Sequence, residues 1–163
     1  MKTLLLLRHA KSSWDDDSLS DHDRPLNKRG RIAAPRMGQL LRELDLVPDL
    51  IISSTANRAA TTAKLAAHGA ECHAELRLDH SLYLAPPERY IRVASRVHEP
   101  VERLMFVGHN PGIEMLVDIL TSSSEPMPTA ALAVIAVPIQ QWSEFSTDLR
   151  CELSRVYRPK ELD

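Results

Sequence analysis

The sequence predicts an α/β protein: a three-layer α/β/α sandwich with a mostly parallel central sheet and an antiparallel edge strand. Short apolar runs alternate with amphipathic segments through most of the 163 residues, as in strands joined by crossover helices. The last two strand-like runs have no helical segment between them, so we expect them to pair antiparallel at one edge. The length fits one domain with a substantial core, and we expect a single domain over residues 1–163.

The chain opens with a predicted central strand, a loop and a helix. Residues 2–7 are a continuous apolar run, typical of a strand buried on both faces, and the Asp- and Ser-rich residues 11–27 read as a loop. A helix is expected from Asn27, its N-cap, to about Leu44, and Pro35 should kink it or mark a later start. One face of this helix is expected to be buried, with Ile32, Met37, Leu40, Leu41 and Leu44.

The remaining elements continue the alternation. Gly69 is expected as the left-handed residue that ends the second helix, and Pro86-Pro87 precedes the third. The further strands are expected at 50–52, 72–76, 103–107, 130–137 and 148–156. The further helices are expected at 56–68, 88–97 and 113–120.

Composition and charge exclude several classes of partner. The net charge of −2 and the pI of about 6.4 give no global support for a nucleic-acid partner. Only four leucines precede Arg8, too few for a signal peptide, and no run approaches membrane-spanning length. Cys72 and Cys151 lie in no metal-ligand spacing and are expected to be reduced. We therefore expect a cytoplasmic monomer or weak oligomer with no membrane partner.

Three short motifs carry the functional information. Each lies where a strand-like run gives way to polar residues, the usual place for a site on an open α/β sheet. The motifs are Leu7-Arg8-His9-Ala10, Ser53-Ser54-x-x-x-Arg58-Ala59-x-x-Thr62-Ala63 and Val107-Gly108-His109-Asn110-Pro111. Together they bring two arginines and two histidines to one edge of the fold.

This combination suits a doubly negative phosphoryl group. The imidazole of His9 is a competent nucleophile toward phosphorus, and Arg8 and Arg58 can donate fork-like hydrogen bonds to phosphate oxygens. His109, if protonated, adds a third positive donor. Taken singly, each residue is more often structural, a surface residue or part of a turn; their occurrence at three strand ends favours a site. Such chemistry needs neither a metal nor an organic cofactor.

The three motifs resemble those of the histidine phosphatase superfamily, which also contains the phosphoglycerate mutases. The short chain, the late His109 and the segment Arg24-Pro25-Leu26-Asn27-x-x-Gly30 resemble its compact branch, the SixA-type phosphohistidine phosphatases. The resemblance extends from Leu4 to about Val137. It implies a phosphoglycerate mutase-like fold and a metal-independent phosphatase that forms a covalent phosphohistidine intermediate.

Carried over by matching position, the resemblance implies that His9 is the phosphorylated nucleophile. Arg8, Arg58 and His109 would form the phosphate pocket. Arg24 matches an arginine that reaches the phosphate in the compact branch. Asn27 would either contribute to phosphate binding or serve only as a helix cap.

The chain departs from the family pattern in informative ways. Ala10 stands where many members have Gly, a conservative change. Many members supply a carboxylic general acid after the third strand, but residues 80–84 contain no carboxylate, and neither Asp79 nor Glu88 fits the pattern. An alkoxide leaving group needs such an acid, whereas a protonated imidazole does not. The motif intervals also leave no room for a large cap insertion over the site.

These departures favour a phosphohistidine in a protein, or another phosphoramidate, as the substrate. The alternatives are a small-molecule phosphomonoesterase that takes its acid from the Asp-rich loop and a non-catalytic phosphate- or phosphoprotein-binding module. A mutase is disfavoured because it needs an enclosed site. The acidic runs at 15–17 and 21–23 are either a solvated loop or a means of repelling small anions and orienting a basic partner.

Overall fold

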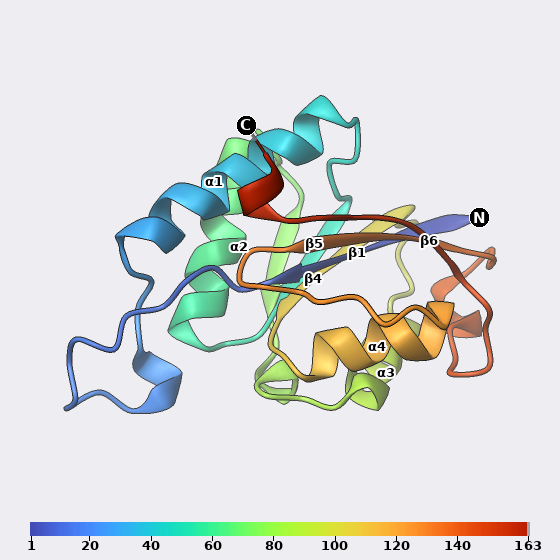
Figure 1. Ribbon diagram of the computed structural model, residues 1–163. Helices are drawn as coiled ribbons and strands as arrows, with labels where there is room; N and C mark the ends of the chain where they lie inside the picture. The colour runs from blue at the N-terminus through green and yellow to red at the C-terminus, as the bar shows by residue number, and fades with distance from the viewer. Residues whose placement is uncertain (163) are drawn as a thin grey trace.

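The computed structural model describes residues 1–162 and confirms the predicted sandwich. Helices α1 and α2 cover one face of a six-stranded sheet, and α3 and α4 cover the other (Figure 1). The strands are β1 (Lys2–Arg8), β2 (Leu50–Ser53), β3 (Glu75–Leu78), β4 (Arg103–Gly108), β5 (Leu132–Val137) and β6 (Glu152–Tyr157). The helices are α1 (Lys28–Glu43), α2 (Asn57–Gly69), α3 (Pro87–Ser95) and α4 (Gly112–Thr121). Short 3-10 turns are η1 (Asp21–Asp23), η2 (His80–Leu82), η3 (Trp142–Glu144) and η4 (Pro159–Glu161).

The sheet places the ends of its central strands at one edge. Its strand order is β3-β2-β4-β1-β5-β6. The first four strands run parallel, whereas β5 pairs antiparallel with both β1 and β6. In this register Arg8 lies beside Gly108, and Ser53 lies beside Val107. The three sequence motifs therefore begin side by side.

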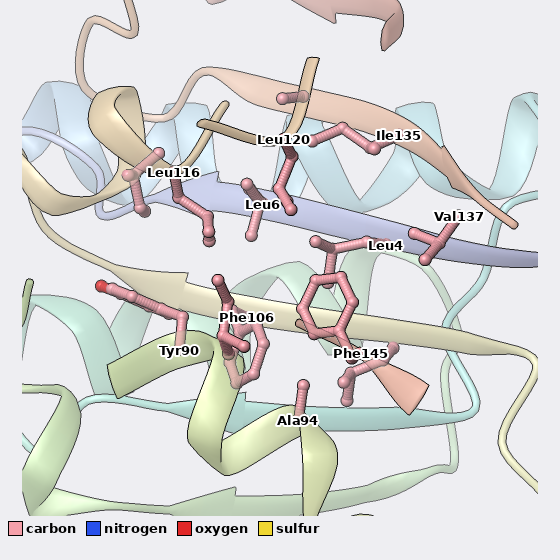
Figure 2. Packing of buried hydrophobic residues seen from close by; sticks show 14 of the residues in the cluster. Leu4, Leu6, Tyr90, Ala94, Phe106, Leu116, Leu120, Ile135, Val137 and Phe145 are labelled. Carbon is pink, nitrogen blue, oxygen red and sulfur yellow. The ribbon is translucent and has the colours of Figure 1, made fainter. Parts of the chain in front are cut away.

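The opening leucines divide the core between the two faces of the sheet. Because side chains alternate along a strand, Leu4 and Leu6 point to the α3/α4 side, whereas Leu5 and Leu7 point to the α1/α2 side. All four are fully buried. On the α3/α4 side Leu6 lies near Phe106, which meets Tyr90 of α3 edge to face (Figure 2). Burial on both faces explains why this run is continuously apolar.

Gly69 was expected to be the left-handed residue that ends the second helix, but the structure shows that it instead allows close packing of α1 against α2. Gly69 is the last residue of α2, and the left-handed residue is Glu71, with φ 52°. A Cβ at Gly69 would lie 2.2 Å from the carbonyl oxygen of Pro35 in α1. The backbone N–H of Cys72 donates to the carbonyl of Ala67 in α2, so Cys72 belongs to the turn that ends the helix and not to the sheet. Strand β3 therefore begins later than expected, at Glu75.

Other element boundaries also differ from the expectation. Helix α1 runs from Lys28 through Pro35 to Glu43, so a later start is wrong. Ile32 is 62% exposed and lies opposite the buried face rather than on it. Strand β6 begins at Glu152 rather than 148 because the N–H of Cys151 donates to the carbonyl of Leu120 instead of to the sheet. No helix within residues 1–162 is long and apolar enough to cross a bilayer.

The approach of α1 to α2 predicts the sign of a stability change. A Cβ at Gly38 would lie 1.9 Å from the carbonyl oxygen of Ala66. Gly38→Ala should therefore lower the free energy of unfolding by about 1–3 kcal/mol, as overpacking does. The higher helix propensity of alanine would by itself raise the free energy of unfolding by about 1 kcal/mol. Urea denaturation measures the difference. The exposed Gln39→Ala is the matched control, and a stabilising Gly38→Ala would contradict the close approach.

Candidate active site

The carboxyl ends of β1, β2 and β4 surround a pocket of about 250 Å³. All three motifs contribute to it, and the loop after β1 completes its wall. The lining residues are Arg8, His9, Lys11, Ser12, Trp14, Arg24, Arg58, Leu84, His109, Asn110 and Thr129. Five of the six predicted site residues thus come together; Asn27 does not line the pocket. Its side chain accepts the N–H of Gly30 and caps α1, so the capping alternative holds.

His9 is presented as a neutral imidazole with one nitrogen free. His9 is buried directly after β1, and its backbone N–H donates to the carbonyl of Gly108. The ring Nδ1 lies 2.8 Å from the carbonyl oxygen of Ala10. Because a carbonyl only accepts, Nδ1 carries the proton and Nε2 keeps its lone pair. Burial, followed by the nearby Arg58 and Arg8 charges, lowers the pKa of His9 to about 4, so the ring is uncharged at neutral pH.

Arg8 is held in place by a carbonyl from a remote loop. Its Nη1 donates to the carbonyl oxygen of Met127 at 3.0 Å. The N–H of Met127 in turn donates to Glu114 Oε1 of α4 at 2.7 Å, and the same carboxylate oxygen accepts from Asn110 Nδ2 at 2.9 Å. Glu114 therefore fixes both the loop that orients Arg8 and the residue that follows His109.

The four-residue spacing of Arg58 and Thr62 in the second motif places both side chains near the site. Arg58 lies in the first turn of α2, where it is buried. Four residues later Thr62 donates to the Arg58 carbonyl at 2.7 Å and accepts the N–H of Ala10 at 2.9 Å. Residues four apart lie on the same side of a helix. Thr62 therefore joins the start of α2 to the residue that holds His9.

His109 faces His9 as a second neutral imidazole. The two ring centroids are 5.2 Å apart, and His109 Nε2 lies 2.8 Å from the hydroxyl of Ser54. Burial, then the neighbouring His9 and Arg58, lowers the pKa of His109 to about 3. The His109 ring is therefore uncharged at neutral pH, and it does not add the third positive charge that a protonated ring would supply. A neutral ring still has one N–H to donate.

Arg24 reaches the pocket from the loop after β1. It is buried and donates from Nη2 to the hydroxyl of Ser12 at 2.7 Å. Its guanidinium carbon lies 3.4 Å from the ring centroid of Trp14, a stacking geometry that arginine favours. An isolated bridge between Ser12 and Leu26 closes this loop. The structure thus places the Arg24 side chain in the wall of the pocket.

Asp21 is the site residue that the sequence analysis did not single out. Arg58 donates from Nη1 to the Asp21 carbonyl at 2.7 Å and from Nη2 to its Oδ2 at 3.0 Å. Asp21 Oδ1 lies 3.5 Å from Arg24 Nε, and the Tyr83 hydroxyl donates to Oδ2 at 2.5 Å. This hydroxyl first, and Arg58 next, lower the pKa of the Asp21 carboxyl. Asp21 was named from the sequence only as part of the acidic run 21–23, and its spacing from Arg24 was a further local signal.

Several buried donors of the pocket are left without an acceptor among residues 1–162. They are Arg8 Nε, Arg24 Nη1 and Arg58 Nε; His109 Nδ1 is also unpaired and is a donor in the tautomer whose Nε2 accepts from the Ser54 hydroxyl. Buried polar groups are almost always hydrogen-bonded, and a tetrahedral oxyanion offers several strong acceptors at once. Within the described chain, no cluster of three or more His, Cys, Asp or Glu side chains could hold a metal ion. The arrangement suits a phosphoryl group bound by protein donors.

Comparisons with known proteins agree with this geometry. The pattern of the histidine phosphatase superfamily (branch 1) matches residues 4–83. An uncharacterized chloroplastic protein of Arabidopsis thaliana is 34% identical over 156 residues, which cover 88% of this chain and 70% of that protein. A structure from Agrobacterium tumefaciens, described as a candidate phosphohistidine phosphatase SixA, has a TM-score of 0.82 and 28% identity. It covers 97% of this chain and 98% of its own.

A further structure shares the fold. The protein histidine phosphatase SixA complexed with tungstate matches with a TM-score of 0.84 and 17% identity, covering 99% of each chain. At that identity the likeness concerns the fold alone. The family pattern, the Arabidopsis relative and the SixA-like architecture together identify the chain as a member of the histidine phosphatase superfamily, in its SixA-type branch.

Proposed function

We propose that this chain is a phosphatase that hydrolyses phosphohistidine in proteins, or another phosphoramidate, through a phosphohistidine intermediate on His9. The observation that carries the proposal is the hydrogen bond from His9 Nδ1 to the Ala10 carbonyl. It fixes the tautomer in which Nε2 has a free lone pair beside four basic or hydrogen-bonding side chains. The branch to which the chain belongs supports a phosphatase.

The reaction would proceed in two displacements at phosphorus. His9 Nε2 attacks the phosphoryl group, the N–P bond of the substrate breaks, and the substrate imidazole leaves with the proton it already carries. Water then attacks the phosphorus of phospho-His9, the new N–P bond breaks, and inorganic phosphate is released. Donors from Arg8, Arg24, Arg58 and His109 would stabilise the equatorial oxygens in both steps.

The state of the nearest carboxylates supports a leaving group that needs no acid. Asp21 lies closest to the phosphate-binding arginines, and its lowered pKa keeps it ionised at neutral pH. An ionised carboxylate has no proton to donate. Neither Asp79 nor Glu88 lines the pocket; Asp79 instead caps η2, where it accepts from the N–H and the hydroxyl of Ser81. Both observations favour a phosphoramidate over an alkyl phosphate.

The rim of the pocket supports a large substrate. Trp14 is 72% exposed and Leu84 is 57% exposed, and both line the opening. We propose that residues 1–163 form a single domain without a large cap insertion. A side chain on a protein surface would then reach the phosphate-binding donors directly.

A small-molecule phosphomonoesterase is the second candidate. One observation favours it: the Asp-rich loop does deliver a carboxylate, Asp21, next to Arg58. A phosphate dianion bound beside Asp21 would favour the protonated form of its carboxyl, which would take the proton from water. The non-catalytic binding module is disfavoured because a binder would not need the free Nε2 of His9.

Covalent labelling tests the nucleophile. Incubation with a phosphohistidine peptide that carries a radiolabelled phosphoryl group, followed by acid and base quenches, should trap acid-labile, base-stable label on the protein. His9→Ala should abolish the label, whereas His68→Ala, an exposed histidine at the end of α2, should retain it. Turnover without label would contradict the covalent mechanism. Phosphate binding without any turnover would favour the binding module.

The tautomer and charge of His9 can be measured directly. Heteronuclear NMR, with His9→Asn to assign the signals, should show the Nδ1–H form ionising near pH 4. The pKa is lowered, so the nucleophile is protonated only at lower pH. The activity controlled by His9 should then be lost as pH falls through about 4. An Nε2–H tautomer, or ionisation near the ordinary value of about 6.5, would contradict this assignment.

Asp21→Asn separates the two enzyme candidates. Wild type should prefer a phosphohistidine peptide to a sugar phosphate by at least tenfold in kcat/KM, about 1.4 kcal/mol. If Asp21 is only a counterion, Asp21→Asn should leave that ratio unchanged. It should also bind inorganic phosphate about fivefold more tightly, because a partly exposed ion pair contributes about 1 kcal/mol. A selective loss of kcat on the sugar phosphate would establish Asp21 as a general acid instead.

A further inference from the structure

A second hollow, larger than the phosphate pocket, adjoins it. Its volume is about 660 Å³, and Lys11 and Thr129 line both. The residues that line it are Lys11, Arg29, Ile32, Ala33, Arg36, Pro128, Thr129, Arg158, Pro159, Lys160 and Glu161. We call this the α1/η4 groove, because its two long walls are α1 and the C-terminal turn η4, which lie side by side (Figure 1). The groove is continuous with the proposed active site.

The wall formed by α1 is a single helical stripe. Arg29, Ile32, Ala33 and Arg36 are spaced i, i+3, i+4 and i+7, so they share one face of the helix. This face is opposite the one that packs on α2. It carries Ile32, a β-branched residue that the core does not use and that is 62% exposed. With Pro128 and Pro159, Ile32 gives the groove an apolar component.

The charge of the groove differs from that of the whole chain. Five basic side chains and one acidic side chain line it, whereas the chain as a whole carries −2. Arg158 is paired with Glu125 and Glu161, and Arg36 is paired with Glu43. Lys11, Arg29 and Lys160 have no hydrogen-bond or ion-pair partner for their side chains among residues 1–162. Of these three side chains, Lys11 also lines the phosphate pocket, so part of this positive charge lies next to it.

We infer that the α1/η4 groove binds an acidic segment of the phosphorylated protein substrate, with an apolar side chain of that segment against Ile32. The inference rests on the proposed function and names the class of substrate: a phosphohistidine flanked by Asp or Glu. Complementary charge would orient the substrate and speed its encounter. The alternative considered for the Asp-rich loop, a basic partner, does not fit this groove.

Two phosphohistidine peptides of equal length test the inference. One carries Glu and Asp on both sides of the phosphohistidine, and the other carries Gln and Asn at the same positions. Wild type should hydrolyse the acidic peptide with about tenfold higher kcat/KM. The preference should shrink between about 0.05 M and about 0.5 M salt, because exposed charges are screened.

Charge reversal locates the effect. The double variant Arg29→Glu/Lys160→Glu should lose the preference while its kcat/KM on the amide peptide stays unchanged, since neither residue lines the phosphate pocket. Arg89→Glu/Arg92→Glu is the matched control: it changes the charge equally, at a separate basic hollow beside α3. This control should keep the preference. Equal rates for the two peptides, or equal effects of the two double variants, would overturn the inference and leave the proposed function intact.

A binding measurement covers the case in which neither peptide is hydrolysed. That result would contradict the proposed function, and fluorescence anisotropy with the unphosphorylated peptides would then test the groove alone. Tighter binding of the acidic peptide, lost in Arg29→Glu/Lys160→Glu, would support the groove. Equal binding of the two peptides would overturn it. Tighter binding of an oligothymidine of the same charge would overturn it in favour of a nucleic-acid groove.

Discussion

The parallel pairing of β4 with its two neighbours is the constraint on which the site depends. It sets Arg8 beside Gly108 and Ser53 beside Val107, and the hydrogen bond from the His9 N–H to Gly108 continues the same pairing past the end of β1. Parallel strands end at the same edge of a sheet. A shift of one residue in either pairing would turn the side chains of a strand to the opposite face and separate His9 from Arg58 and His109.

Burial next to arginine side chains determines the protonation state of the two histidines at this edge of the sheet. Arg58 is buried and keeps one carboxylate partner, Asp21, as a buried charge requires. The same positive surroundings, added to desolvation, hold His9 and His109 neutral. A neutral imidazole is the nucleophilic form, so on our proposal the positive charges that bind a phosphoryl dianion also keep the attacking nitrogen of His9 unprotonated. Asp21 lowers the net positive charge of the site.

Helix α1 links the core to the surface around the site. Its inner face packs so closely on α2 that Gly38 has no room for a side chain, and this holds the helix that carries Arg58. Its N-terminus is capped by Asn27, at the end of the loop that supplies Arg24. Its outer face carries Arg29 and Ile32 along the α1/η4 groove. One helix thus positions the edge of the sheet that carries the candidate site and, on our inference, the substrate beside it.

The sequence by itself determined the sandwich, the order of its elements and the three motifs, because strand and helix periodicity and strand-end residues are local properties. Only the tertiary structure decided that Ile32 faces outward and that Asp21 lies against Arg58. The two partners are 37 positions apart, and no local pattern encodes a contact between a loop and a remote helix. Gly69 shows the same limit: its sequence context predicts a helix end, but the constraint on it is the carbonyl of Pro35 in another helix.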